Sequence, residues 1–134
     1  MAYPSLNAPL DAARIAALCD GVHYGADFQA LDVSSDSRNL RAGELFVALR
    51  GANFRGEDFL AAAQGQGAVA AIVAEHQPEV DLPQIVVADT LAALQALARD
   101  RRARCQAQFF AITGSNGKTS TKEMLQRLLQ TRGQ

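Results

Sequence analysis

The sequence has no tryptophan and only two cysteines among its 134 residues. Cys19 and Cys105 lie far apart, with no CxxC spacing and no neighbouring histidine, which argues against a disulfide framework and against a cysteine-based metal or redox centre. Both lie in alanine- and leucine-rich segments, so we expect buried free thiols. His23 and His76 are equally isolated, and neither is predicted to bind a metal.

Long apolar runs and an excess of charge of one sign are also missing. No stretch approaches the roughly 20 apolar residues that span a bilayer. The N-terminal segment has no charged region followed by an apolar one, as a signal peptide would have, so we expect a cytoplasmic protein. The net charge of −1 gives no reason to expect nucleic acid as a partner.

One basic run does occur near residue 100. It comprises Arg99, Arg101, Arg102 and Arg104 and is interrupted by Asp100. Because it lies on a predicted helix, we interpret it as a solvated helix face, with an anion or partner contact as the alternative.

Short apolar runs alternate with helical patterns along the whole chain. Apolar runs predict strands near residues 28–34, 45–49, 68–75, 84–89 and 108–113. Helices are predicted over residues 11–19, with Gly21 as the stop, over 57–67 and 90–104, and from Lys118 onward. This order predicts an α/β fold whose small, largely parallel or mixed sheet is flanked by helices.

The segment "TGSNGKTSTKEML" has the composition of a phosphate-binding loop. Gly114 and Gly117 allow a sharp turn and a close approach of the backbone to phosphate oxygens. The helix that begins near Lys118 directs unpaired N–H groups toward an anion. Lys118 is predicted to contact the β- and γ-phosphates of ATP and to act in catalysis, while the Thr119 hydroxyl is predicted to ligate Mg²⁺. The predicted ATP-binding residues are Gly114, Ser115, Asn116, Gly117, Lys118, Thr119 and Ser120.

The loop departs from the full Walker pattern at one position. That pattern has a glycine five residues before Gly117, where this chain has Ile112. The remaining GxxGK[ST] pattern still follows an apolar run and precedes an amphipathic helix. The alternative is a glycine-containing strand–helix turn without a ligand, and we favour phosphate binding.

The loop without its first Walker glycine resembles the ATP loop of the Mur ligases. The resemblance extends through "SSDSRNLRAGELFVALRGANFRGEDF", "GAVAAIVAE" and "LPQIVVADTLAALQALA", which cover most of the chain from Val33 onward. It implies an N-terminal uridine-nucleotide-binding domain at residues 1–106. Residues 107–134 would then be the opening strand, phosphate loop and helix of an incomplete central ATP-binding domain.

The resemblance also implies a substrate site. Ser35, Asp36, Ser37 and Arg38, with the loop after residues 45–49, would help to hold the uridine-linked substrate. From the residue types alone, the alternative is a turn that ends a strand, with Arg38 in a structural ion pair. The family usually has Asp-Gly-His-Asp-Phe where this chain has "RGEDF", so we expect no histidine to act in that loop.

Within the family, "KTSTKEML" favours the ligase that joins D-alanyl-D-alanine to a UDP-N-acetylmuramoyl-tripeptide. The resemblance implies ATP and Mg²⁺ as cofactors and these two small molecules as substrates. Three alternatives remain: a sister ligase that adds another amino acid, a non-catalytic module that binds a uridine nucleotide or a partner, and an unrelated P-loop kinase or ATPase.

Overall fold

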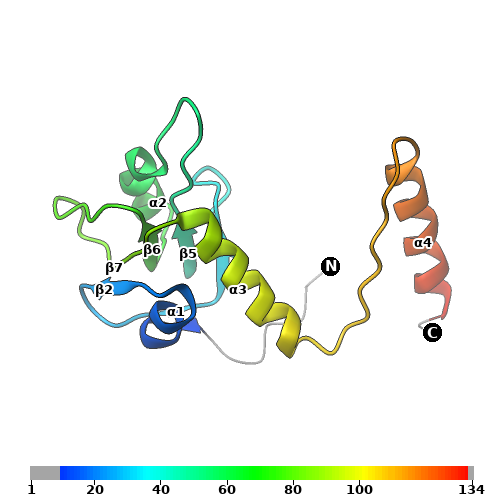
Figure 1. Cartoon of the computed structure of the whole chain (residues 1–134), viewed down its shortest axis with the longest axis horizontal. Coiled ribbons are helices and arrows are strands. Elements are labelled where there is room, and N and C mark those ends of the chain that lie inside the picture. Colours follow the sequence, from blue (N-terminus) through cyan, green and yellow to red (C-terminus); the bar gives the residue numbers. More distant parts are fainter. Residues whose placement is uncertain (1–9, 133–134) are drawn as a thin grey trace. The chain divides into compact units, whose positions relative to one another are not determined.

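The chain divides between Arg104 and Cys105 into two compact units. The computed structural model describes residues 10–132, which Figure 1 traces from blue to red. The first unit holds every strand found in these residues, and the second holds a single helix.

The first unit is built on a five-stranded mixed sheet with the strand order β2-β7-β6-β5-β4. Four neighbouring strands run parallel, and β2 pairs with β7 in the antiparallel sense. The strands are β2 (Val22–Tyr24), β4 (Asp32–Ser34), β5 (Glu44–Val47), β6 (Ala70–Val73) and β7 (Gln84–Val86). Two further short strands, β1 (Leu10–Asp11) and β3 (Gln29–Ala30), form a separate antiparallel pair. The predicted α/β class with a small mixed sheet is confirmed.

The apolar runs at residues 45–49 and 68–75 contain strands β5 and β6, which are buried on both faces. Along β5, Leu45 and Val47 pack into one core cluster and Phe46 into the other, because successive side chains of a strand point to opposite faces. Helices α1 (Ala12–Cys19) and α3 (Thr90–Arg104) contribute to the first cluster. The short helices η1 (Gly56–Phe59) and α2 (Leu60–Gly65) are joined end to end, and α2 contributes Leu60 and Ala63 to the second.

Helix α1 begins as predicted but ends differently. The Asp11 carboxylate accepts a hydrogen bond of 2.7 Å from the Arg14 backbone N–H and caps the helix. Asp20, not Gly21, adopts the left-handed conformation at its end, with φ of 51°. Aspartate tolerates this conformation better than most residues. Gly21 is required for another reason, because a Cβ there would lie 2.6 Å from Ile85 Cγ2.

The basic run on α3 is only partly a solvated face. Arg101 pairs with Asp32 at 2.8 Å, and Arg104 pairs with Asp100. Asp100 also forms an ion pair with Arg14, with 3.1 Å between Oδ1 and Nη2, and this pair joins α1 to α3. The prediction of a solvated helix face is therefore wrong for Arg101, because Asp32, which is distant in sequence, packs against it. Arg104 remains exposed and pairs with a carboxylate one turn earlier on the same helix.

The second unit contains helix α4 (Lys118–Arg132), which confirms the predicted helix. The strand predicted at residues 108–113 is wrong, since these residues form no strand. A strand requires a neighbouring strand for its backbone hydrogen bonds, and no described segment pairs with this one. Phe109 and Phe110 remain about half exposed.

Both cysteines are free thiols, as predicted. The sequence also predicted that they would be buried, but both are only partly buried. Cys19 lies at the end of α1 with its sulfur 3.7 Å from the Ala93 carbonyl oxygen, and burial raises its pKa. Cys105 directly follows α3 and is also partly buried. None of the helices within residues 10–132 has the length and apolar character needed to cross a bilayer.

Candidate functional site

A hollow of about 690 Å³ lies in the first unit where the parallel strands β4 and β5 end. Ligands of open α/β sheets bind beyond the carboxyl ends of parallel strands. The hollow, here called the strand-end pocket, brings together the four predicted substrate residues and residues of the loop after β5. Its lining residues are Ser35, Asp36, Ser37, Arg38, Phe46, Leu49, Phe54, Gly56, Phe59, Ala62 and Gln66.

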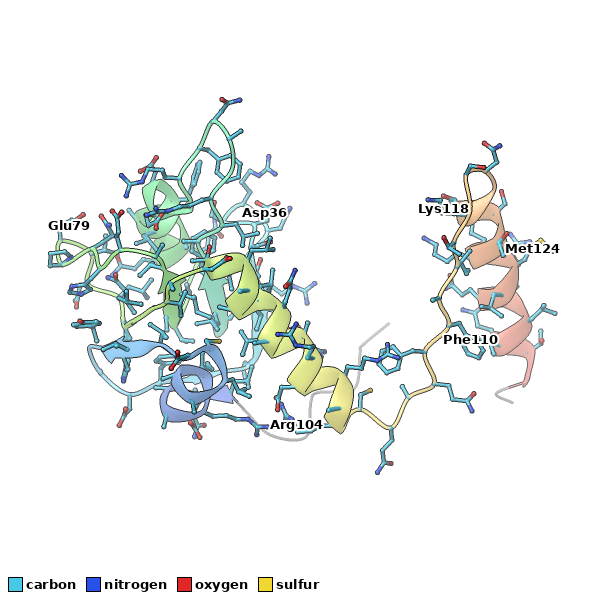
Figure 2. All side chains as sticks on the ribbon, in the orientation of Figure 1. Asp36, Glu79, Arg104, Phe110, Lys118 and Met124 are labelled. Carbon is cyan, nitrogen blue, oxygen red and sulfur yellow. The ribbon has the colours of Figure 1, made fainter. Side chains whose placement is uncertain are left out.

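The polar side of the strand-end pocket is a turn organised by Asp36, which Figure 2 labels. Its carboxylate accepts hydrogen bonds from the Arg38 backbone N–H at 3.0 Å, from Arg38 Nε and Nη2 at 3.0 and 3.1 Å, and from Asn39 Nδ2 at 3.0 Å. The bonded Arg38 side chain lowers the pKa of Asp36 from its ordinary 3.8 to about 2. The turn and ion pair considered from the sequence are thus both present, and they hold Arg38 on the pocket rim.

Several donors of this turn remain available to a ligand. Within residues 10–132, the hydroxyls of Ser35 and Ser37 make no hydrogen bond, whereas the Ser34 hydroxyl accepts one from the Asp36 N–H. Arg38 binds the Asp36 carboxylate through Nε and Nη2, so its Nη1 makes no bond to Asp36. The rim therefore offers two hydroxyls and one guanidinium edge, a donor set suited to an anion or a polar ring edge.

The strand-end pocket also has an aromatic side. Phe54 and Phe59 expose 53% and 43% of their surface, while Phe46 closes the floor from β5. Exposed rings beside a polar rim suit a flat ligand that carries polar groups. The sequence pointed to the loop after β5 as a whole but gave no reason to single out these two rings.

Close packing shapes the loop that carries Phe54. The Gly51 N–H donates a 3.0 Å hydrogen bond to the Phe54 carbonyl, and Arg50 and Arg55 face each other across an antiparallel bridge. Residues 50–55 thus form a tight turn, here called the Phe54 hairpin. A Cβ on Gly51 would lie 2.1 Å from the Phe54 ring, and one on Gly56 would lie 2.4 Å from the Ala48 carbonyl carbon. Glycine at 51 and 56 allows the hairpin to fold at the pocket edge.

The phosphate loop lies in the second unit at the start of α4, where Figure 2 labels Lys118. Gly114 and Gly117 have positive φ angles of 149° and 75°, as the sequence reasoning required. The Thr121 N–H donates a 2.9 Å bond to the Gly117 carbonyl and opens the helical ladder. The preceding N–H groups of the first turn therefore have no helical acceptor and point toward the loop.

The predicted ATP residues are exposed and close in sequence. All seven, from Gly114 to Ser120, are solvent-accessible, so the loop presents its N–H groups and the Lys118 ammonium openly. A positive helix end with a lysine is an anion-binding arrangement.

The described residues do not form a magnesium site of their own. In the described part of the chain, no three histidine, cysteine or acidic side chains cluster around a common point. The exposed Thr119 hydroxyl is an oxygen donor of the kind that Mg²⁺ binds. These residues therefore fit Mg²⁺ only as a shared ion, with Thr119 supplying one ligand and bound phosphates supplying others.

Comparison with known proteins identifies relatives of both units. The family described as "Mur ligase family, catalytic domain" matches residues 32–102. The chain is 41% identical over 116 residues to the UDP-N-acetylmuramoyl-tripeptide–D-alanyl-D-alanine ligase of Escherichia coli, covering 87% of this chain and 25% of the relative. It is 42% identical over 112 residues to the UDP-N-acetylmuramoyl-L-alanyl-D-glutamate–2,6-diaminopimelate ligase of Bacillus velezensis, covering 80% and 23%.

Solved structures give the same picture. A UDP-N-acetylmuramoylalanyl-D-glutamyl-2,6-diaminopimelate–D-alanyl-D-alanyl ligase from Acinetobacter baumannii superimposes with a TM-score of 0.80 at 32% identity, covering 98% of this chain and 30% of that one. A MurF ligase from Thermotoga maritima in complex with ADP has a TM-score of 0.62 at 34% identity, covering 75% and 23%. The chain spans about a quarter of the length of the curated relatives it matches.

Proposed function

Because this chain belongs to the Mur ligase family, we propose that it supplies the uridine-substrate domain and the start of the ATP-binding domain of a peptidoglycan-precursor ligase. We further propose that this ligase joins D-alanyl-D-alanine to a UDP-N-acetylmuramoyl-tripeptide. The observation that carries the proposal is the strand-end pocket, where residues 35–38 meet Phe54 and Phe59 in a single hollow.

The strand-end pocket has two sides that match the two parts of a uridine diphosphate. The aromatic side, with Phe54 and Phe59, offers ring faces to a pyrimidine base. The polar side offers the Ser35 and Ser37 hydroxyls and the Arg38 guanidinium to the diphosphate or to the edge of the base. In this proposal Asp36 is a positioning residue, because it fixes Arg38 rather than contacting the anionic ligand.

The second unit has the start of an ATP site. In the proposed reaction, the terminal carboxylate of the peptide attacks the γ-phosphorus of ATP, and ADP leaves, which gives an acyl phosphate. The amine of D-alanyl-D-alanine then attacks the acyl carbon, phosphate leaves, and the nitrogen loses a proton. Lys118 stabilises negative charge on the transferred phosphoryl group, and the N–H groups of the first turn of α4 bind phosphate oxygens. Mg²⁺ supplies further charge neutralisation when bound, with Thr119 as one ligand.

A sister ligase that adds diaminopimelate is the second candidate, favoured by the 42% identity to the Bacillus velezensis relative. The two candidates share the strand-end pocket and the phosphate loop, so these features do not separate them. A chimera in which this chain replaces the matching segment of the Escherichia coli relative, assayed with each UDP-peptide and each amine, tests whether the chain supports the D-alanyl-D-alanine reaction.

Titration of the isotopically labelled chain with uridine diphosphate tests the substrate domain directly. We expect shifts in the amide signals of residues 35–38 and 50–59, saturating in the millimolar range because the muramoyl-peptide contacts are absent. Adenosine diphosphate should instead shift the signals of residues 114–121, with a dissociation constant weaker than about 1 mM.

A pair of variants supplies the control. Arg38→Gln should weaken uridine diphosphate binding, whereas Arg41→Gln should not, because Arg41 is exposed nearby but does not line the strand-end pocket. If uridine diphosphate leaves residues 35–38 and 50–59 unchanged, the substrate assignment is wrong.

A further inference from the structure

Four charged side chains tie the Phe54 hairpin to the carboxyl end of β6. Arg50 Nη2 lies 3.0 Å from Glu57 Oε1 and 3.1 Å from Glu75 Oε1, and Arg55 Nη2 lies 2.8 Å from Glu75 Oε2. Glu57 Oε1 also accepts a hydrogen bond of 3.2 Å from the Ala74 N–H, directly after β6. Arg50, Arg55, Glu57 and Glu75 are here called the hairpin clamp.

Glu57 is the buried member of the hairpin clamp. Its side chain is 2% exposed, and Oε1 accepts bonds from both Arg50 and Ala74. Its Oε2 is buried and has no hydrogen-bond partner within the described residues. Burial works to raise the pKa of Glu57, but the bonds from Arg50 and the backbone N–H groups outweigh it and keep the pKa below its ordinary value. Glu57 therefore stays ionised with one oxygen unsatisfied.

Stability alone does not account for this arrangement. A buried ion pair often adds little to folding relative to an apolar replacement, and an unsatisfied buried oxygen carries a desolvation cost. The clamp also brings two like charges, Arg50 and Arg55, together across one bridge. Glu75 bridges the two arginines, because its Oε1 pairs with Arg50 and its Oε2 pairs with Arg55.

The geometry of the clamp determines where the pocket edge lies. Arg50 and Arg55 are the first and last residues of the Phe54 hairpin, so fixing both fixes the turn between them. Glu57 belongs to η1, whose Gly56 and Phe59 line the strand-end pocket. The clamp thus holds both aromatic rings of the pocket relative to the sheet.

We propose that the hairpin clamp is a positioning device for ligand binding, which holds Phe54 and Phe59 in place at the strand-end pocket for stacking on a flat nucleotide base. This inference rests on the proposed function, since it assumes that the strand-end pocket takes the uridine nucleotide. The clamp residues act through the two rings and do not touch the ligand. Preorganised rings raise affinity because binding then orders fewer groups.

Two exposed members of the clamp allow a test that leaves the core intact. Arg55 and Glu75 side chains are 52% and 60% exposed, so Arg55→Gln and Glu75→Gln should lower the melting temperature of the chain by only a few degrees and leave it folded. Each variant should weaken uridine diphosphate binding about three- to fivefold, the scale of one exposed ion pair. Each should also speed solvent exchange of the Gly51 amide, whose bond to Phe54 closes the hairpin.

Controls separate positioning from charge and from folding. Glu79→Gln removes an equal charge from a neighbouring loop and should change neither the binding nor the Gly51 exchange. Arg55→Lys keeps the positive charge opposite Glu75 and should recover part of the lost affinity. Amides of β6 and β7 should exchange as in the unaltered chain.

The outcomes are distinct. If the unaltered chain binds no uridine diphosphate, the proposed function fails and the inference falls with it. If the unaltered chain binds and Arg55→Gln and Glu75→Gln bind equally well, the positioning role is overturned and the proposed function stands. Unchanged Gly51 exchange in both variants would also overturn it. Weaker binding together with faster Gly51 exchange supports the clamp.

Discussion

Residues 10–104 and residues 105–132 both contain apolar runs followed by helices. Their large apolar side chains are mostly buried in the first unit and mostly exposed in the second. In the first unit, Phe46 and Ile72 are fully buried between the sheet and its helices. In the second, Met124 and Leu128 on α4 remain 66% and 62% exposed, although the sequence predicted an amphipathic helix there. The comparison teaches that the loop and helix of such a sequence take their local conformations alone, whereas strand formation and burial depend on neighbouring strands being present.

The two candidate sites follow the same division. The strand-end pocket collects residues from segments separated by up to about 30 positions in the sequence, so it exists only once the sheet has formed. The phosphate loop spans residues 114–120 and needs only a turn and the first turn of a helix. One site is therefore a product of tertiary packing, and the other of local backbone geometry.

The largest expected difference between the units lies in amide exchange. Amides of β5 and β6 should exchange at least about 1000-fold more slowly than those of α4, because a folding free energy of about 5 kcal/mol protects the core. An isolated helix of 15 residues is marginal in water. Hydrogen exchange followed by NMR measures this ratio, and similar protection in both units would contradict the contrast drawn here.

The next effect concerns Lys118 in the chimera with the Escherichia coli relative. Lys118→Ala should lower turnover at least about 100-fold, because one charge partner of the transferred phosphoryl group is lost. Lys122→Ala, one turn further along α4, should have little effect. Turnover near that of the unaltered chimera in Lys118→Ala would remove the role assigned to this residue.

A smaller effect is expected for glycine substitutions. Gly56→Ala should destabilise the first unit by about 2 kcal/mol, because the new Cβ would meet the Ala48 and Leu49 backbone at 2.4–2.6 Å. Gly65→Ala is the matched control, since it meets nothing within 4 Å in helix α2 and should be neutral or stabilising. Gly117→Ala strains a positive φ in the second unit and should leave urea unfolding of the first unit unchanged. Equal effects of Gly56→Ala and Gly65→Ala would show that the close contact is not rigid.

The smallest effect is the titration of Asp36. Its folded pKa of about 2 lies below its ordinary 3.8, so the ion pair with Arg38 stabilises the first unit above pH 3.8. That contribution is lost as the pH falls from 3.8 through about 2. Carboxyl NMR shifts should give a midpoint near 2 in the unaltered chain and a midpoint closer to 3.8 in Arg38→Gln. A midpoint that does not move in Arg38→Gln would mean that another group holds the carboxylate.

Much of the architecture could be predicted from local sequence features. The apolar run at residues 45–49 predicted a strand covered on both faces, and helix α3 has the bounds expected for it. The edge strand β2 was missed, because three residues with exposed Val22 and Tyr24 carry no periodic signal. The strand expected at residues 108–113 is absent, because apolar residues alone do not make a strand without a hydrogen-bonding neighbour.

The sequence by itself determined what depends on neighbours along the chain. This includes the glycine turn of the phosphate loop, the start of α4 at Lys118, and the Asp36 turn that holds Arg38. Backbone sterics and hydrogen bonds within a few residues act before any tertiary contact forms. Only the tertiary structure decided that Phe54 and Phe59 line one pocket with residues 35–38, and that Glu75 joins Arg50 to Arg55. These contacts depend on the parallel alignment of β4, β5 and β6, whose hydrogen bonds link segments that no local pattern connects.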